Sequence, residues 1–250
     1  MISEMVMHAG RAGMLFAAVI KTLPRVRNCL PDVWRHAKRI ADGLPLVLTM
    51  GAISGAVLAQ QTSYQLNPSL PDSVIGVAVA AGVLTELGPV LTAIVLAGRI
   101  GAGTGAEIAT MKVSDQIDAL LTLGRDPVLE LVTPRLLAAS AMLPICVLLA
   151  DCVGIAAGHL FSTMLLGVEP HQFLAGVKEQ YHHPALIFSA TKGFLFGIII
   201  AFVSCYTGLQ ARGGAAGVGR TATSAVVSII MWVMVTDAVI APLYKTIATS

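Results

Sequence analysis

Apolar residues gather along this chain in long runs that few polar residues interrupt. A helix needs about 20 such residues to cross a hydrocarbon core about 30 Å thick. Windows near or above that length occur at Leu44–Tyr64, Val74–Gly98, Leu136–Gly167, Ala185–Leu209 and Ala222–Tyr244. The pattern therefore predicts an all-α integral membrane protein with about five transmembrane helices. Gln60 and Gln61 shorten the apolar part of the first window, so a re-entrant segment is the alternative there.

The first 43 residues have a different pattern, in which apolar clusters alternate with basic residues. Seven of the sixteen Lys and Arg residues lie here, and Pro24 and Pro31 interrupt the segment. Such a composition is typical of amphipathic helices that lie in the headgroup plane of a membrane. We therefore expect an interfacial region over residues 1–43 and a transmembrane domain over residues 44–250. A disordered basic tail is the alternative for the first region.

The composition agrees with a membrane protein and excludes several other classes. Hydrophobic residues make up 56% of the chain and charged residues 12%, about half the charged share of soluble domains. No long basic run could follow a phosphate backbone, so nucleic acid is not an expected partner. Neither G-x-x-x-x-G-K-[ST] nor H-E-x-x-H occurs, so we expect no catalytic or metal site in this chain.

The basic residues also predict the orientation of the chain in the membrane. If the N-terminus is cytoplasmic, thirteen of the sixteen Lys and Arg residues lie on the inner side. The excess of basic residues in cytoplasmic segments therefore places the N-terminus inside. Loops 99–135 and 210–221 then face the cytoplasm, and loops 65–73 and 168–184 face outward.

Small residues recur within the predicted spans at the spacing of one helical turn. In lipid such pairs let two helix backbones approach closely, so we expect the spans to form a compact bundle. The pairs are Gly101 and Gly105, Gly154 and Gly158, and Gly193 and Gly197.

The long inner loop contains the pattern of a short helix from Asp115 to Leu123. Ser114 is the expected N-cap, Asp115 puts a negative charge in the first turn, and Gly124 suits the residue after the helix. The apolar residues cover more than the one face that a lone surface helix needs. Either a partner docks on this helix, or the helix packs back on its own bundle. These apolar residues are Ile117, Leu120, Leu121 and Leu123.

Four ionisable residues lie inside the predicted spans, where each charge costs about 3 kcal/mol to insert. They are Glu86, Asp151, Lys192 and Asp237. One cation among three acids predicts a buried cluster in which Lys192 bridges at least one carboxylate. An interhelical ion pair with a purely structural role is the alternative to a functional cluster.

Glu86 also lies close to a break in its helix. Pro89 follows three residues later, and a helical proline leaves the carbonyl four positions before it, here that of Thr85, without its usual N–H partner. A kink and a carboxylate therefore coincide within the membrane. Irregular backbone at this depth is tolerated where it is buried in protein or lines a wet cavity. Ordinary kinked packing is the alternative.

Several of these residues belong to longer motifs with fixed spacing. The sequence contains Glu86-Leu-Gly-Pro89, Ala97-Gly-Arg-Ile-Gly101, Asp115-Gln-Ile-Asp118, Gly124-Arg-Asp-Pro127, Pro134-Arg135, Cys205-Tyr-x-Gly208 and Gly217-Val-Gly-Arg220. Over most of residues 45–247 the chain resembles the MlaE/YrbE permeases. These are the membrane subunits of ABC transporters that work with Mce-domain proteins to move lipids between bacterial membranes.

The resemblance implies a fold, partners and a location. It implies an MlaE-like permease in the bacterial inner membrane, with a second permease copy, most simply a homodimer, and two cytoplasmic ATPase subunits. An Mce-domain protein and membrane lipids would be the other partners. ATP and Mg²⁺ would belong to the ATPase, and this chain would hold no cofactor.

The resemblance also implies roles for particular residues. A coupling helix would lie near residues 114–124, and polar residues inside the spans would lie near the lipid path. The residues at or near the ATPase contact would be Glu107, Lys112, Asp115, Gln116, Asp118 and Leu120. The intramembrane or pathway residues would be Glu86, Pro89, Arg99, Asp151, Lys192 and Asp237.

Two other functions compete with a lipid permease powered by ATP. In a proton-coupled secondary transporter of an amphipathic substrate, Glu86, Asp151 or Asp237 would carry protons and no ATPase would be needed. In a structural scaffold for the Mce-type partner, transport would occur elsewhere. The surplus of apolar residues on the inner helix and the length of the motif favour the permease.

Overall fold

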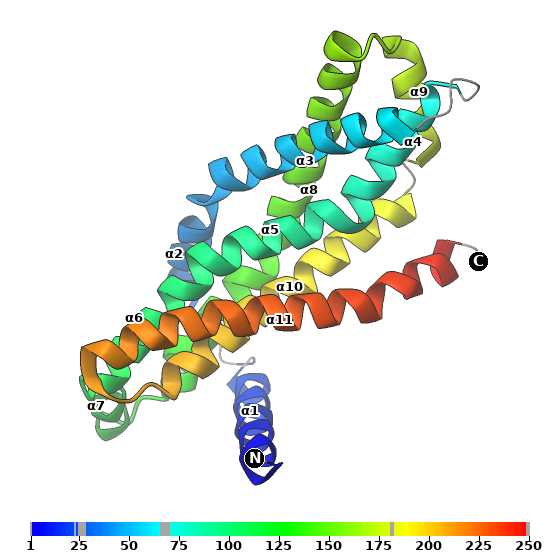
Figure 1. Ribbon diagram of the computed structural model, residues 1–250. Coiled ribbons are helices and arrows are strands. Elements are labelled where there is room, and N and C mark those ends of the chain that lie inside the picture. The colour runs from blue at the N-terminus through cyan, green and yellow to red at the C-terminus, as the bar shows by residue number, and fades with distance from the viewer. Residues whose placement is uncertain (1, 23, 25–28, 66–70, 181–182, 249–250) are drawn as a thin grey trace.

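The computed structural model describes residues 2–22, 24, 29–65, 71–180 and 183–248. This part of the chain is helical and contains no strand (Figure 1). In chain order its helices are α1 (Ile2–Thr22), α2 (Leu30–Ala41), α3 (Leu44–Gln65), α4 (Ser73–Gly82), η2 (Val83–Leu87), α5 (Gly88–Leu96), η3 (Ala97–Gly101), α6 (Ala102–Val113), α7 (Gln116–Thr122), η4 (Val128–Val132), α8 (Thr133–Leu165), α9 (Pro170–Gln180), α10 (His183–Leu209) and α11 (Gly214–Ala248). The three η segments are π-helical turns.

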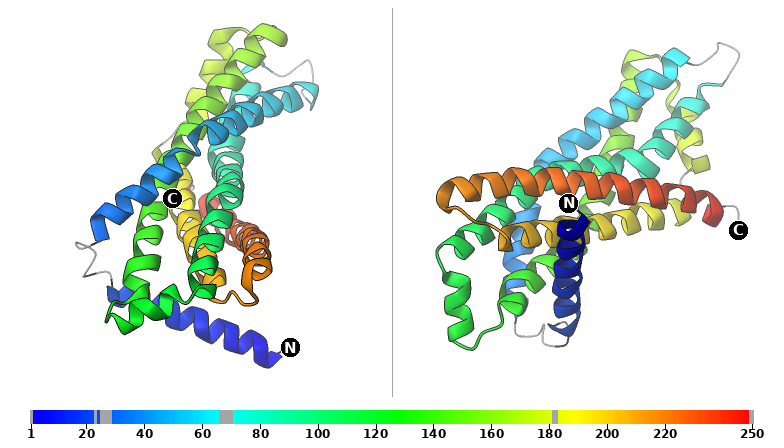
Figure 2. Two further views of the ribbon diagram at one scale, coloured as in Figure 1. Left: turned by 90° about the vertical axis from the view of Figure 1, so that its left-hand side faces the viewer. Right: turned by 60° about the horizontal axis from the view of Figure 1, so that its bottom comes forward.

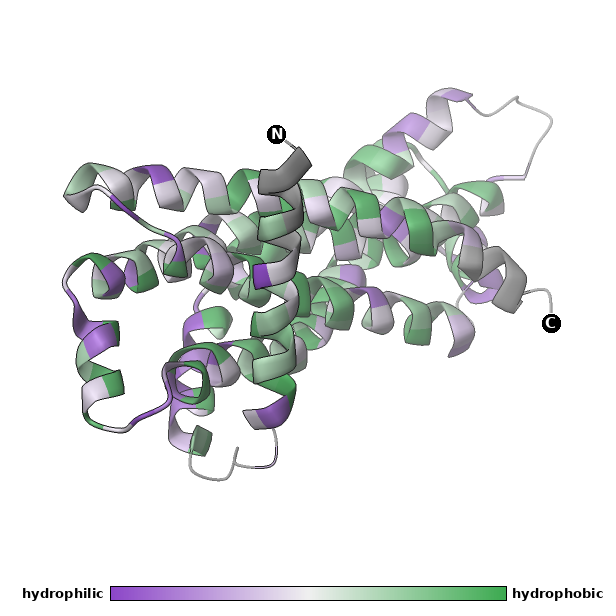
Figure 3. Ribbon diagram, turned by 90° about the horizontal axis from the view of Figure 1, so that it is seen from below, coloured by the Kyte–Doolittle hydropathy of each residue, from purple (hydrophilic) through white to green (hydrophobic). Residues whose placement is uncertain are grey.

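Within the described residues, five helical segments are long and apolar enough to cross a membrane, as predicted. They are Leu44–Gln65, Ser73–Val113, Val128–Leu165, His183–Leu209 and Gly214–Pro242. The first is the single continuous helix α3, whose 22 residues span about 33 Å, so it is not re-entrant. Hydrophilic residues lie mainly toward the ends of these segments (Figure 3).

The five segments lie side by side, with α7 at one end of the bundle and α9 at the other (Figure 1). We call these the α7 end and the α9 end. Helix α8 packs along both α3 and α10, and α11 packs against α10 and α6. One hydrophobic core extends from Val19 of α1 through these spans to Val233 of α11.

The second and third spans extend further than the sequence predicted. The second continues past Gly98 to Val113, and the third begins at Val128, so the loop between them covers 114–127 instead of 99–135. The helix continues through Gly98 and Gly101 because η3, which contains both, is packed against the neighbouring helix α11. A Cβ on Gly101 would meet Ile229 of α11 at 2.5 Å.

The predicted loop 168–184 contains a helix that the sequence pattern did not predict. Helix α9 covers Pro170–Gln180. Its Phe173 side chain is fully buried against α4, where the second span begins. The side chain packs in a second, smaller core with Ile75 and Val79 of α4. The sequence pattern missed this helix because its apolar residues do not form a clear helical stripe. Most of the predicted loop 65–73 lies outside the described residues.

Both N-terminal segments are helices, so a disordered tail is wrong for the described part of residues 1–43. Helix α2 packs on α8 and buries Ile40. Helix α1 crosses the direction of the spans at the α7 end (Figure 2). Its Met14, Phe16 and Ile20 remain exposed, as expected of a helix that meets lipid.

Glycines bring the spans into contact at the predicted spacing. A Cβ on Gly158 of α8 would lie 3.1 Å from the carbonyl oxygen of Gly55, and a Cβ on Gly197 of α10 would lie 2.6 Å from that of Ala139. A Cβ on Gly55 of α3 would overlap the carbonyl oxygen of Gly154. At Gly55 and Gly197 the backbones therefore approach too closely for a side chain, and at Gly158 a side chain would require its neighbours to move.

This packing predicts that Gly55→Ala destabilises the bundle. The added methyl group must push α3 away from α8, at a cost of about 1–3 kcal/mol, which is typical of overpacking. Thermal unfolding in mild detergent would measure the loss. Gly103→Ala is the matched control because a Cβ at Gly103 meets nothing within 4 Å, so this variant should be as stable as the wild type or more stable.

Candidate functional site

An ion cluster centred on the buried Lys192 of α10 joins three spans, and its Glu86 side chain is 44% exposed. The Lys192 side chain is fully buried. Its Nζ lies 3.0 Å from Oε2 of Glu86 in η2 and 2.7 Å from Oδ1 of Asp237 in α11. Lys192 therefore bridges two carboxylates, as the sequence predicted. The cluster holds one positive and two negative formal charges.

The third oxygen around the Lys192 ammonium is the carbonyl that Pro89 leaves without an N–H. Lys192 Nζ donates a hydrogen bond of 2.7 Å to the Thr85 oxygen. Glu86 and the Thr85 carbonyl both lie in η2, and both contact Lys192. The predicted kink and the Glu86 carboxylate therefore belong to one site. The ring centroid of Phe188 lies 5.0 Å from the same Nζ, within the range of a cation–π contact.

Asp151 of α8 lies apart from this cluster, so the prediction of one group of four is wrong for this residue. Its Oδ2 accepts a hydrogen bond of 2.6 Å from the Ser189 hydroxyl. Its Oδ1 is buried without a hydrogen-bond partner in the described part of the chain, and it occupies the space that a Cβ on Gly88 would need. Asp151 therefore joins α8 to α10 and packs against the start of α5.

Arg99 also lies away from the Lys192 cluster. It is in η3, thirteen residues after Glu86 in one continuous helical segment, which corresponds to about 20 Å. Its exposed side chain lines a pocket of about 260 Å³ together with Arg39, Asp42 and Glu107. Arg99 therefore belongs to a separate polar group near the α7 end.

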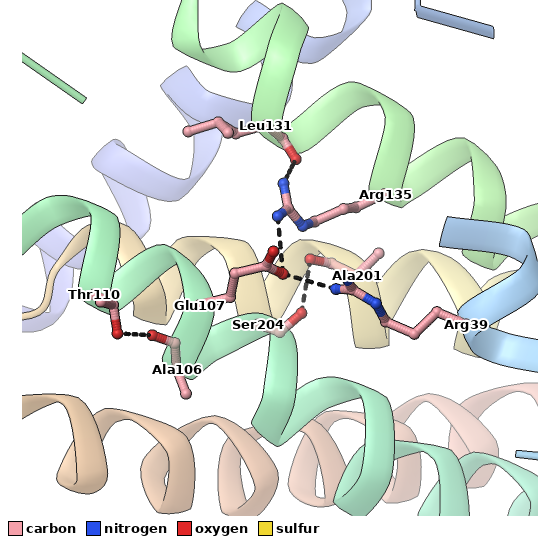
Figure 4. A network of polar contacts seen from close by, with 8 residues as sticks. All are labelled: Arg39, Ala106, Glu107, Thr110, Leu131, Arg135, Ala201 and Ser204. Carbon is pink, nitrogen blue, oxygen red and sulfur yellow. Dashed lines mark hydrogen bonds and ion pairs between the residues drawn. The ribbon is translucent and has the colours of Figure 1, made fainter. Parts of the chain in front are cut away.

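Glu107 of α6 is held by two arginines from other helices (Figure 4). Its Oε2 lies 2.8 Å from Arg39 of α2 and 3.0 Å from Arg135 of α8. Arg135 is buried and also donates a hydrogen bond of 2.6 Å to the Leu131 carbonyl. The sequence did not predict this group, although Arg135 belongs to one of the family motifs, because nothing in the spacing pairs it with Glu107.

The charges of this group affect a neighbouring histidine on α2. Burial, and then the positive charges of Arg135 and Arg39, lower the pKa of His36 to about 4. The His36 imidazole is therefore neutral near pH 7, and it adds no third positive charge beside Glu107.

Helix α7 forms where the sequence predicted a short helix, but its N-terminal cap differs. Ser114 ends α6, and its hydroxyl bonds back to the Thr110 carbonyl. Asp115 is the N-cap, with a left-handed backbone at φ 56°, so it is not in the first turn. This conformation turns the chain sharply between α6 and α7. Gly124 follows α7 with φ 71°, as expected of a residue that ends a helix.

The apolar residues of α7 divide between two environments. Ile117 is buried and Leu120 packs against the main core, whereas Leu121 and Leu123 are 58% and 75% exposed. An ion pair of 3.2 Å between Lys112 and Asp118 holds α7 to the end of α6. Two of the four residues thus pack back on the bundle, and two form an open apolar surface at the end of the molecule.

The site contains no obvious metal centre. Among the described residues, no three His, Cys, Asp or Glu side chains are placed to hold a metal ion. The arrangement instead offers a buried ammonium that could pair with an anionic group and an exposed apolar helix that could receive a partner.

The ion cluster predicts a strong effect of Lys192→Met on stability. Removing the cation leaves the mostly buried Asp237 and the partly exposed Glu86 without a positive partner, which should cost about 1–3 kcal/mol. Adding Glu86→Gln and Asp237→Asn to the same chain should restore most of this loss. Chemical unfolding in detergent measures both. Lys178→Met on α9, which is exposed, is the control and should leave stability unchanged.

Known proteins are similar to this chain over most of its length. Residues 34–243 match the family described as Permease MlaE. A probable ABC transporter permease protein of Rickettsia typhi is 38% identical over 200 residues, which cover 80% of this chain and 77% of the relative. A probable ABC transporter permease protein of Synechocystis is 36% identical over 196 residues, covering 78% and 74%.

A more distant relative matches an even larger part of the chain. The chloroplastic protein trigalactosyldiacylglycerol 1 of Arabidopsis thaliana is 32% identical over 235 residues, which cover 93% of this chain and 66% of the relative. The family match, over residues 34–243, includes all five spans, the Lys192 cluster and α7. The chain is a multi-pass ABC transporter permease and belongs to the MlaE permease family.

Proposed function

We propose that this permease moves phospholipids between the inner membrane of a bacterium and an Mce-domain carrier, powered by a separate cytoplasmic ATPase. The observation that carries the proposal is that a single family match, over residues 34–243, includes both the intramembrane ion cluster and α7. The name of the Arabidopsis relative, which contains that of a galactolipid, supports a lipid as the substrate.

The physical demands of lipid extraction suit this chain. Removing an acyl chain from a membrane into water costs about 0.8 kcal/mol for each methylene group, so a lipid transporter needs both an apolar path and an energy source. The spans are apolar apart from a few buried polar groups. The sequence has no P-loop, so the ATP and Mg²⁺ would be held by the partner ATPase.

Helix α7 is the proposed contact with the ATPase. Leu121 and Leu123 form its apolar surface, and Asp115, Gln116 and Asp118 of the same turn and helix are also exposed. Because Ile117 and Leu120 of α7 pack on the main core and Lys112 of α6 pairs with Asp118, a push on α7 would shift the second span as a rigid body. Of the residues expected at this contact, Glu107 and Leu120 face the bundle, so their proposed role is to transmit the shift.

The Lys192 cluster is the proposed polar group of the lipid path, and α11 connects it to a second permease copy. Asp237 faces Lys192, whereas a row of exposed apolar residues follows another face of α11 at every fourth position. A second copy that packs on this row would place both Lys192 clusters near the shared interface. The row consists of Val227, Met231, Val235 and Val239.

The proposed orientation places the α7 end in the cytoplasm. The positive-inside rule favours this orientation, since basic residues of α1, α2, α6 and the turn before α11 all lie at this end. An ATPase in the cytoplasm could then reach α7, and an Mce-domain carrier would approach the α9 end.

Purification with a tag in mild detergent tests the proposed function as a whole. Mass spectrometry should find an ATPase in fixed proportion to the permease, together with bound phospholipid. A permease that carries neither would overturn the proposal and favour proton-coupled transport. If a variant with Lys192→Met, Glu86→Gln and Asp237→Asn still assembled and moved lipid at the wild-type rate, the cluster would have no part in the path.

Replacing the exposed leucines of α7 tests the coupling surface. Leu121→Asp together with Leu123→Asp should reduce the co-purified ATPase at least tenfold, because it puts two charges into an apolar contact. The matched control is Leu174→Asp, an exposed leucine on α9 at the opposite end, which should retain the ATPase. Equal recovery from both variants would show that the ATPase binds elsewhere.

A further inference from the structure

A basic cleft lies at the α7 end, between α1 and the turn that joins α10 to α11. Its volume is about 690 Å³, which is within the usual range of small-ligand sites. Three cations from separate parts of the chain line it: Arg11 of α1, Lys112 of α6 and Arg212 of the turn. Met7 and Leu209 add an apolar wall. The cleft is therefore amphipathic, with one charged side and one apolar side.

The positive charge of this cleft is largely uncompensated. Lys112 has an acidic partner, since its Nζ lies 3.2 Å from Oδ1 of Asp118. Arg11 and Arg212 are exposed, and among the side chains that the structure describes neither has an ion-pair partner. Two guanidinium groups that converge on one space fit a phosphate, because each can donate two parallel hydrogen bonds to its oxygens.

The position of α1 indicates where such a phosphate would come from. Met14, Phe16 and Ile20 are exposed on the same helix as Arg11, and side chains of this kind enter the boundary between headgroups and acyl chains. Figure 2 shows that α1 crosses the end of the bundle, and Figure 3 shows its mixed hydropathy. The cleft therefore opens at headgroup level, where Met7 and Leu209 could contact the glycerol and the first methylene groups.

We propose that this cleft binds the phosphate of an anionic phospholipid from the leaflet at the α7 end. The site is distinct from the Lys192 cluster, because Leu209 follows Lys192 by seventeen residues on α10, which corresponds to about 25 Å. The bound phosphate joins α1 to α6 and to the start of α11. It also competes with Asp118 for Lys112, and so acts on the exposed ion pair between α6 and α7.

Replacing Arg11 and Arg212 tests this site without changing Lys112. Native mass spectrometry of the full-length protein in detergent would follow the binding of dioleoyl phosphatidylglycerol and of dioleoyl phosphatidylcholine. Arg11→Gln with Arg212→Gln should weaken phosphatidylglycerol binding about thirtyfold, since each basic residue contributes about fivefold near anionic lipid. Phosphatidylcholine binding should be the same in wild type and variant. Lys21→Gln, an exposed position on α1 outside the cleft, should bind as the wild type does.

Three further results would each contradict an anionic phospholipid site. Equal phosphatidylglycerol binding by the wild type and the double variant would overturn the proposal. Displacement of the lipid by millimolar glycerol 3-phosphate would indicate a site for a soluble phosphate. Loss of the ATPase from the double variant with unchanged lipid binding would make the cleft an ATPase surface.

Two controls keep the result interpretable. If the double variant fails to fold, the single variants Arg11→Gln and Arg212→Gln should each weaken binding about fivefold. The Lys178→Met variant should keep the phosphatidylglycerol site, because Lys178 is exposed on α9 at the opposite end of the bundle. A permease that does not move lipid at all could still bind lipid in this cleft. The proposal of lipid transport and the proposal of a lipid site in the cleft can therefore be disproved separately.

Discussion

The structure depends on the burial of one ammonium group within the membrane. An unpaired charge at this depth is costly, so Lys192 must be surrounded by oxygens from elsewhere in the bundle. Glu86, Asp237 and the Thr85 carbonyl supply them from two other spans. The second span can offer this carbonyl because Pro89 lacks an N–H, and the π-helical turn before it aims Glu86 at the same point.

Close packing by glycine makes this arrangement possible. Gly193, beside Lys192, would place a Cβ 3.0 Å from Cα of Pro144, so α10 lies directly against α8. Gly55 and Gly154 likewise bring α3 directly against α8. In lipid, where apolar burial against acyl chains gives little driving force, such contacts between backbones hold the helices together. These backbone contacts fix the position of α10, and therefore of Lys192, relative to α8.

The ion cluster and α7 are mechanically connected. One helical segment, Ser73–Val113, contains Glu86 and ends at α7, where Lys112 pairs with Asp118. Near that end, Arg39 and Arg135 hold Glu107 of the same segment to α2 and α8. A shift of α7 would therefore move the second span together with the helices attached to it. This connection gives a physical basis for coupling an event at the α7 end to the buried cluster.

The sequence by itself determined the five spans, because long apolar runs are a local property. It also predicted that Lys192 bridges carboxylates, since one cation has few partners in lipid. Only the tertiary structure decided that Asp151 pairs with Ser189 and that Glu107 pairs with arginines of other helices. It also decided that the second span continues to Val113. Such outcomes depend on distances between helices far apart in the chain, and local patterns carry no information about those distances.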